Sequence, residues 1–245
     1  MRLIELGAVS WNDRVSPDRR LGDGDVELIL TPHWAPAAAM PQLLGLLAPD
    51  DRKLIERYAE PEARDRAIAS RAVLRLLLAQ HLGLPPAALE IAPTAHGKPL
   101  VRDRDPKGRS VAFNLSHTDD LLLFGFARAP IGVDIERIAP IPDLDAFARL
   151  ALSDRERAAC AALPVERRLN EVYRHWVAKE AIAKRSGEGL RRNFSKINLS
   201  SEQGEPGLGV TLFVPQDGTV AAFAAPEHAI PRFHRIFDLS DLLRD

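Results

Sequence analysis

Two carboxylates interrupt an apolar stretch in the middle of the chain, IGVDIERI at residues 131–138. The β-branched residues of this stretch predict a strand, and side chains alternate across a strand, so Asp134 and Glu136 share one face. Two such carboxylates repel each other, and taking them out of water is costly unless a cation lies near. The pair therefore indicates either a metal site or a solvated edge strand.

A second pair of charges lies in a predicted helix over residues 166–187. One apolar stripe runs along this helix, formed by Leu169, Tyr173, Trp176 and Val177. Glu180 and Lys184 fall on the same stripe. A surface ion pair between residues four apart explains their spacing but not their placement. An inward Glu180 completes a set of three carboxylates suited to Mg²⁺, and Lys184 suits a phosphate or a transition-state charge.

Other polar residues are ordinary when each is taken alone. Ser116 and His117 end a predicted strand in FNLSHTDD, and Lys98 belongs to the turn HGKP. A predicted helix over residues 62–82 carries Arg66, Arg71 and Arg75. A loop histidine, a solvated turn and a charged helix face explain these residues as well as a binding site does.

The overall composition limits the class of protein. The chain has 245 residues with 33 basic and 34 acidic side chains, which gives no basic field for nucleic acid. One cysteine, Cys160, excludes an internal disulfide and a cysteine-cluster metal site. We find no signal peptide and no membrane-spanning stretch, so we expect a cytoplasmic globular protein. Strands mixed with helices, without strict βαβ alternation, favour the α+β class.

Taken together, the motifs GKP, FNLSH, IGVDIE and WVAKEAIAK have the order and spacing found in surfactin-type 4′-phosphopantetheinyl transferases. The chain resembles this family over about residues 48–190. These enzymes transfer 4′-phosphopantetheine from coenzyme A to a serine of an acyl or peptidyl carrier protein and release 3′,5′-ADP. The resemblance implies a monomer of two similar α+β halves related by a pseudo-twofold. With a boundary at Pro130, residues 1–130 form the coenzyme A side and residues 131–245 the metal and catalytic side.

The resemblance also implies roles for single residues. The Mg²⁺ ligands are Asp134, Glu136 and Glu180. Glu180 and Lys184 are the catalytic residues, as the base for the serine hydroxyl and the contact to the phosphate under attack. Coenzyme A is bound by Arg66, Arg75, Lys98, Ser116, His117, Lys179 and Lys184. Glu156 matches a motif acid whose role the sequence leaves open.

One departure from the family concerns the coenzyme A 3′-phosphate. The family often carries two lysines upstream of the helix over residues 62–82, and an ungapped alignment places Asp51 and Leu54 there. Arg52 and Lys53 are their neighbours. Either the register slips, or this protein holds the 3′-phosphate differently.

The carrier protein needs a docking surface beside the site. Residues 141–152 are predicted to be helical and carry apolar side chains at helical spacing, namely Ile141, Leu144, Phe147 and Leu150. These side chains either meet the carrier or pack inward. The sequence does not specify the carrier, the pathway or a preference for Mg²⁺ over Mn²⁺.

Two rival functions use the same residues. A Mg²⁺-dependent nuclease also combines clustered acids with a lysine, but the balanced charge disfavours it. A catalytically silent module that binds coenzyme A or a carrier protein is the other, and it does not need the full set of acids together with Lys184.

Overall fold

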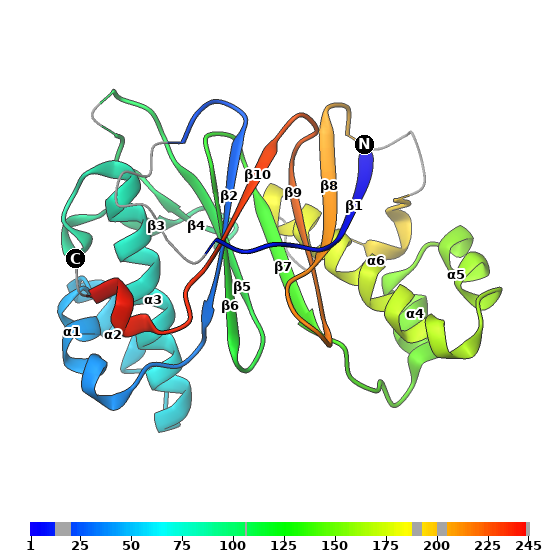
Figure 1. The fold of residues 1–245 in the computed structure, drawn as a ribbon, viewed down its shortest axis with the longest axis horizontal. Helices are drawn as coiled ribbons and strands as arrows, with labels where there is room; N and C mark the ends of the chain where they lie inside the picture. The colour runs from blue at the N-terminus through cyan, green and yellow to red at the C-terminus, as the bar shows by residue number, and fades with distance from the viewer. Residues whose placement is uncertain (13–20, 106, 188–192, 200–204, 244–245) are drawn as a thin grey trace.

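The chain folds into four layers, with helices outside and two β-sheets facing each other inside (Figure 1). The computed structural model describes residues 1–12, 21–105, 107–187, 193–199 and 205–243. It is a mixed structure of helices and mainly antiparallel strands, which confirms the predicted α+β class. No helix within these described ranges is long and apolar enough to cross a membrane.

The first sheet has the strand order β10-β2-β6-β5. Its strands are β10 (Ile230–Arg235), β2 (Asp25–Pro32), β6 (Leu121–Ala127) and β5 (Ala112–His117). Helix α3 (Pro61–Leu82) packs on its outer face. This helix matches the one predicted over residues 62–82, and it ends at Gly83, whose positive φ of 69° is a left-handed conformation that glycine adopts readily.

The second sheet has the strand order β1-β8-β9-β7. Its strands are β1 (Arg2–Ala8), β8 (Leu208–Val214), β9 (Thr219–Pro226) and β7 (Gly132–Arg137). Helix α6 (Val165–Ser186) covers its outer face. This helix matches the one predicted over residues 166–187.

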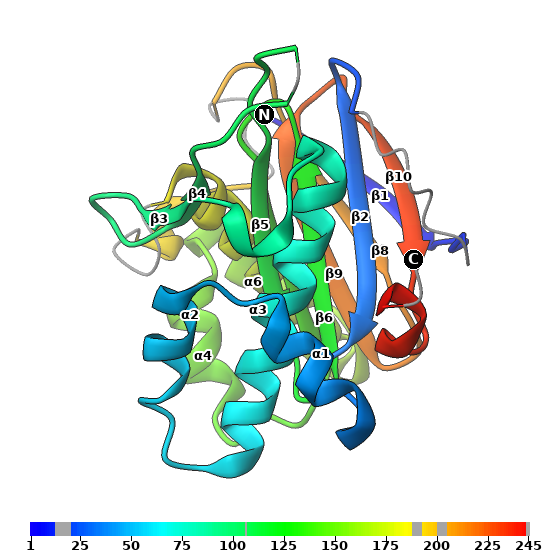
Figure 2. The same cartoon turned by 90° about the vertical axis from the view of Figure 1, so that its left-hand side faces the viewer.

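Shorter elements complete the layers. The helices are α1 (Met40–Gly45), α2 (Pro49–Ile55), α4 (Leu144–Ala151) and α5 (Asp154–Ala161). The 3₁₀ turns are η1 (Ala37–Ala39), η2 (Pro86–Ala88), η4 (Phe194–Lys196) and η5 (Leu239–Leu243). A separate hairpin, β3 (Ile91–Pro93) and β4 (Pro99–Val101), stands out from the body of the molecule (Figure 2).

The two sheets share a connection pattern, but the ends of the chain cross between them. Each sheet contains a strand, a covering helix and a hairpin whose second strand lies between the other two: β2-α3-β5-β6 and β7-α6-β8-β9. The N-terminal β1 joins the second sheet and the C-terminal β10 joins the first, each as a parallel edge strand. A division of the chain at Pro130 therefore assigns β1 and β10 to the wrong sheets.

The central strands are apolar on both faces, because alternate side chains enter two different cores. In β6, Leu122, Phe124 and Phe126 point toward α3, whereas Leu121 and Leu123 point into the core between the sheets. Strands buried on both faces have no place for an unpaired charge. Acidic side chains on such a strand therefore need a specific counter-charge.

Candidate active site

The predicted acids line one cavity of about 480 Å³, between β5 and β7 on one side and α6 on the other. We call it the acidic cavity. Its walls are Leu115, Ser116, His117, Asp134, Glu136, Trp176, Glu180 and Lys184. The structure thus brings together three carboxylates and an ammonium group that the sequence places up to 50 residues apart.

The alternation of side chains along β7, together with one glycine, places Asp134 against α6. On β7, Val133 and Ile135 enter the core between the sheets, so Asp134 faces the helix. At Gly132 an added Cβ would lie 2.0 Å from the carbonyl oxygen of Ala181, which no side chain tolerates. Glycine therefore permits α6 to lie close enough for its side chains to reach those of β7.

Lys184 connects α6 to both strands of the cavity, β5 and β7. Its Nζ donates to Asp134 Oδ1 at 2.6 Å and to Ser116 Oγ at 2.8 Å. The Ser116 hydroxyl lies 2.8 Å from the same Asp134 oxygen. The other oxygen, Asp134 Oδ2, is buried without a hydrogen-bond partner in the part of the chain that the structure describes.

The remaining two acids hold their protons more tightly than free glutamates. Burial, with Asp134 and Glu136 nearby, raises the pKa of Glu180 to about 7, although Lys184 opposes this. Burial and the Asp134 charge also raise the pKa of Glu136, against the hydrogen bond that Trp176 Nε1 donates to it at 3.2 Å. Among the described residues that line this cavity, Lys184 supplies one ammonium group, which does not offset three carboxylates.

This charge imbalance fits a divalent cation. Carboxylate oxygens are the ligands that Mg²⁺ prefers, and Asp134 Oδ2 is a buried acceptor to which no described residue donates. Within the described residues, however, no three acidic, histidine or cysteine side chains are already gathered closely enough to hold a metal ion. The donor set fits the ion chemically, whereas its side chains are spread around the cavity.

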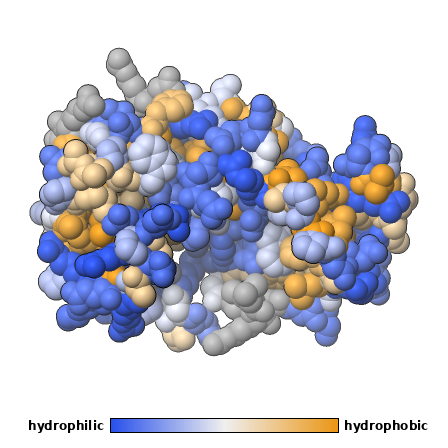
Figure 3. Space-filling model, turned by 90° about the horizontal axis from the view of Figure 1, so that it is seen from below, coloured by the Kyte–Doolittle hydropathy of each residue, from blue (hydrophilic) through white to orange (hydrophobic). Residues whose placement is uncertain are grey.

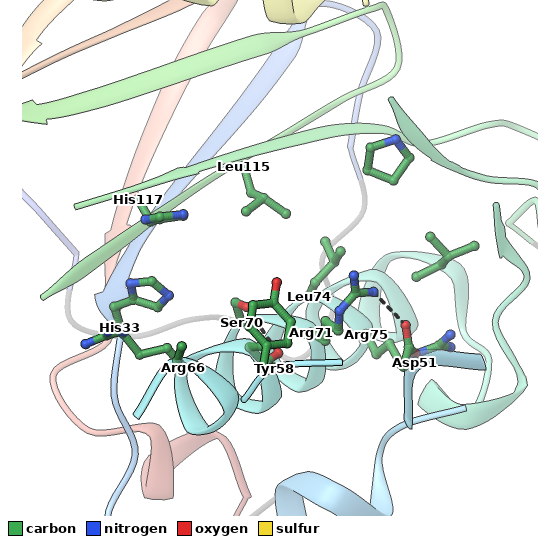
Figure 4. Close-up of a pocket in the computed structure, with 14 residues that line it drawn as sticks. His33, Asp51, Tyr58, Arg66, Ser70, Arg71, Leu74, Arg75, Leu115 and His117 are labelled. Atoms are coloured by element: carbon green, nitrogen blue, oxygen red, sulfur yellow. Dashed lines mark hydrogen bonds and ion pairs between the residues drawn. The ribbon is translucent and has the colours of Figure 1, made fainter. Parts of the chain in front are cut away.

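A second cavity, of about 430 Å³, opens between α3 and the end of β5 (Figure 4). We call it the arginine pocket. It is lined by His33, Asp51, Tyr58, Ala63, Arg66, Ala67, Ser70, Arg71, Leu74, Arg75, Ile91, Pro99, Leu115 and His117. Leu115 and His117 line both cavities, so the arginine pocket and the acidic cavity adjoin.

Asp51, one of the two departures from the family pattern, organises the arginine pocket. Its carboxylate pairs with Arg75 Nε and, at 2.9 Å, with Arg71 Nη1. Its neighbours point elsewhere, since Arg52 donates to the carbonyl of Leu44 and Lys53 pairs with Asp50 at the surface.

Arg75, which is predicted to contact coenzyme A, lines the arginine pocket, and its observed partners lie within the protein. Arg75 is 3% exposed, and besides Asp51 it donates through Nη1 to the carbonyls of Pro86 and Leu89. Its charge is already paired inside the protein. Arg66 and Arg71, on the same helix, are the arginines with accessible side chains in this pocket.

Lys98 is likewise predicted to contact coenzyme A, and its observed partners are backbone carbonyls. Its Nζ donates to the carbonyls of Ile131 and Arg185, both at 3.0 Å, and it lines neither cavity. Two of its three N–H donors are thus committed to backbone carbonyls of the other half of the chain. This geometry gives no support to a contact between Lys98 and coenzyme A.

Lys179, which is also predicted to contact coenzyme A, is fully buried. Its ammonium donates to Glu156 Oε2 at 2.5 Å and to the carbonyls of Ala151 and Phe194. Glu156 in turn accepts hydrogen bonds from the backbone N–H groups of Ser153 and Leu199. Burial alone raises the pKa of Glu156, but these hydrogen bonds outweigh it and lower the pKa. Both residues therefore support α5 and α6 structurally.

Sequence reasoning missed several residues of the site. His33 stacks on His117 with ring centroids 4.6 Å apart, and burial, despite a hydrogen bond to Thr118, lowers its pKa. Trp176 was expected only as part of an apolar stripe, but it also binds Glu136. The signal for His33 was weak, because a histidine directly after a strand ending in proline is common in loops.

The predicted docking segment forms α4, and its apolar side chains differ in exposure. Leu144 and Phe147 are half-buried, and Phe147 packs on Trp176 with ring centroids 4.9 Å apart. Ile141 is also half-buried. Leu150 is 61% exposed, so part of the set packs inward and Leu150 faces solvent.

Comparisons with known proteins identify related sequences. Residues 130–221 match the model of the 4′-phosphopantetheinyl transferase superfamily, and residues 32–125 match that of the N-terminal region of 4′-phosphopantetheinyl transferase. The chain is 31% identical to the 4′-phosphopantetheinyl transferase HetI of Nostoc sp. over 217 residues, covering 85% of this chain and 90% of the relative. A putative 4′-phosphopantetheinyl transferase of Synechocystis sp. is 31% identical, covering 70% and 71%. The transferase Sfp of Bacillus subtilis is 25% identical, covering 66% and 70%.

Replacing Lys179 tests its structural role. Lys179→Met leaves the Glu156 carboxylate buried without its counter-charge, so we expect the free energy of unfolding to fall by about 3–5 kcal/mol in urea titrations. The double variant Lys179→Met/Glu156→Gln should recover part of the loss. An unchanged stability of Lys179→Met would contradict this role.

Replacing Glu180 tests the repulsion in the acidic cavity. Since the folded protein keeps the Glu180 proton up to about pH 7 but the unfolded chain loses it near 4.5, this group lowers stability as the pH rises through that window. In EDTA at pH 8 we therefore expect Glu180→Gln to unfold at a higher urea concentration than the wild type. Its free energy of unfolding should be higher by about 1–3 kcal/mol, and this difference should become smaller at pH 5. The exposed Glu56→Gln is the control, and a Glu180→Gln variant no more stable than the wild type would refute the argument.

Proposed function

Because the chain belongs to the 4′-phosphopantetheinyl transferase superfamily, we propose that the acidic cavity is where the transferred phosphate reacts and that the arginine pocket holds the nucleotide end of coenzyme A. The protein is a transferase that moves 4′-phosphopantetheine from coenzyme A to a serine of a carrier protein. This activity is therefore preferred to the two rival functions, a nuclease and a silent binding module.

One observation carries the proposal: a cavity with three carboxylates and one lysine adjoins a pocket with accessible arginines, and His117 lines both. A ligand with a diphosphate in its middle and a phosphate at its nucleotide end needs cationic groups at both places. The arginine pocket offers Arg66 and Arg71 for the 3′-phosphate. The acidic cavity needs a cation before it can accept phosphates at all.

Asp134, Glu136 and Glu180 would hold that cation, which we propose to be Mg²⁺. When bound, Mg²⁺ neutralises the diphosphate and makes its phosphorus more electrophilic. The protein's own groups do the rest. Glu180 accepts the proton of the carrier serine hydroxyl, directly or through a water molecule.

The serine oxygen then forms a bond to the phosphorus next to pantetheine, and the bond from that phosphorus to 3′,5′-ADP breaks. Lys184, held by Asp134 and Ser116, stabilises the negative charge that develops on the phosphate oxygens. Ser116 and His117 would contact the phosphates, since Ser116 lines the acidic cavity and His117 lines both cavities.

Finer features of the family are also part of the proposal. The motif spacing supports the surfactin-type subclass, and the shared strand–helix–hairpin pattern of the two sheets supports halves related by a pseudo-twofold. Both cavities are built within one chain, which supports a monomer. The acyl or peptidyl carrier protein would approach along α4, where Leu150 is exposed. Figure 3 shows apolar patches on the lobe of α4, α5 and α6.

Transfer is tested by mass spectrometry of intact apo acyl and peptidyl carrier proteins incubated with the protein, coenzyme A and Mg²⁺. We expect a gain of one phosphopantetheine that EDTA abolishes and that Glu180→Gln slows by about 10²–10⁴-fold. Glu56→Gln should react like the wild type. No gain on any carrier would refute the transferase activity, and near-normal transfer by Glu180→Gln would refute the role of Glu180.

Docking on α4 is tested with Leu150→Asp. Because a charge at this apolar contact opposes burial, we expect the KM for the carrier protein to rise about tenfold while the KM for coenzyme A is unchanged. Ile230→Asp alters an equally exposed aliphatic residue on β10 and serves as the control. A carrier KM unchanged in Leu150→Asp would exclude this docking surface.

A further inference from the structure

Lys98 reaches across from the first half of the chain to the second. The turn between β3 and β4 presents it, with a hydrogen bond from the Lys98 backbone N–H to Thr94 Oγ1 at 3.1 Å. Its Nζ then donates to the carbonyls of Ile131 and Arg185 at 3.0 Å each. The side-chain stem passes over Gly187, where an added Cβ would lie 3.5 Å from Lys98 Cδ.

The two carbonyls belong to the elements that carry the acidic cavity. Ile131 directly precedes β7 and stands three residues before Asp134, whereas Arg185 follows Lys184 in the last turn of α6. At the same place Gly132 allows the closest approach of α6 to β7. Lys98 therefore binds the residue before β7 and the last turn of α6, at the place where the two elements lie close together.

Elementary electrostatics explains why a lysine suits this place. The last carbonyls of a helix have no partner within the helix and carry a partial negative charge, which an ammonium group satisfies. Burial between the two halves lowers the pKa of Lys98 to about 8, with a contribution from Arg185. The side chain is thus half-buried, and its ammonium group is directed at protein carbonyls.

We propose that Lys98 is a positioning residue, which fixes the last turn of α6 against the start of β7 and thereby sets the place of Lys184 relative to Asp134. For its effect on catalysis, this inference rests on the proposed transferase function. It differs from the role implied by the family resemblance, in which Lys98 contacts coenzyme A. The two roles predict opposite effects on kcat and on ligand affinity.

The experiment compares Lys98→Met and Lys98→Arg with Lys53→Met, which removes a lysine 71% exposed on α2. With apo carrier protein and coenzyme A, we expect Lys98→Met to lower kcat by about 10- to 100-fold, because small displacements of catalytic groups cost this much. Coenzyme A affinity, measured by calorimetry, should stay within about twofold. Lys98→Arg should restore part of kcat, since a guanidinium also donates to both carbonyls.

Weaker coenzyme A binding with kcat retained would overturn the proposal in favour of a ligand contact. A lower melting temperature with full kcat in the folded variant would overturn it in favour of stability alone. Amide hydrogen exchange of residues 181–186 gives a readout that does not need activity: we expect faster exchange in Lys98→Met, and unchanged exchange would overturn the proposal even if the wild-type protein transferred nothing. If Lys98→Met does not fold, the same measurements on Lys98→Arg decide.

Discussion

The mutual repulsion of Asp134, Glu136 and Glu180 is the constraint around which the site is organised. Among the described residues that line the acidic cavity, three carry carboxylates and one, Lys184, carries an ammonium group. Such an arrangement costs stability, as the raised pKa values of Glu136 and Glu180 show. Groups that oppose folding are retained where a ligand compensates for them, and a divalent cation with its bound phosphates supplies that compensation.

The rest of the fold holds these acids in place despite the repulsion. Both faces of β7 are enclosed, one by the apolar core between the sheets and the other by α6. The buried pair of Lys179 and Glu156 ties α6 to α5 and to the segment at Phe194. Since breaking such a pair is expensive, it fixes α6 relative to α5 and this segment. The packing of Val177, Ala181 and Ile182 on the second sheet holds the helix that carries Glu180 and Lys184 in place despite the repulsion.

Local patterns in the sequence predicted the elements and the acidic cavity, but not the partners of every charged residue. The apolar stripes of α3 and α6 and the alternation in β7 are periodic features, so both helices and the placement of Asp134, Glu136, Glu180 and Lys184 around one cavity follow from them. Arg75, Lys98 and Lys179 occur in the same motifs, yet each pairs with groups far away in the sequence. The parallel edge strands β1 and β10 depend on the same kind of long-range pairing, and no local signal reports their exchange between the sheets.

Strand geometry also explains how one short segment serves two cavities. Ser116 and His117 are consecutive on β5, so their side chains point to opposite faces. Ser116 meets Lys184 and Asp134 of the second half, whereas His117 stacks on His33 above the arginine pocket of the first. The packing of the two sheets therefore sets the distance between the acidic cavity and the arginine pocket. In the proposed function, this distance determines the length of a ligand that occupies both cavities.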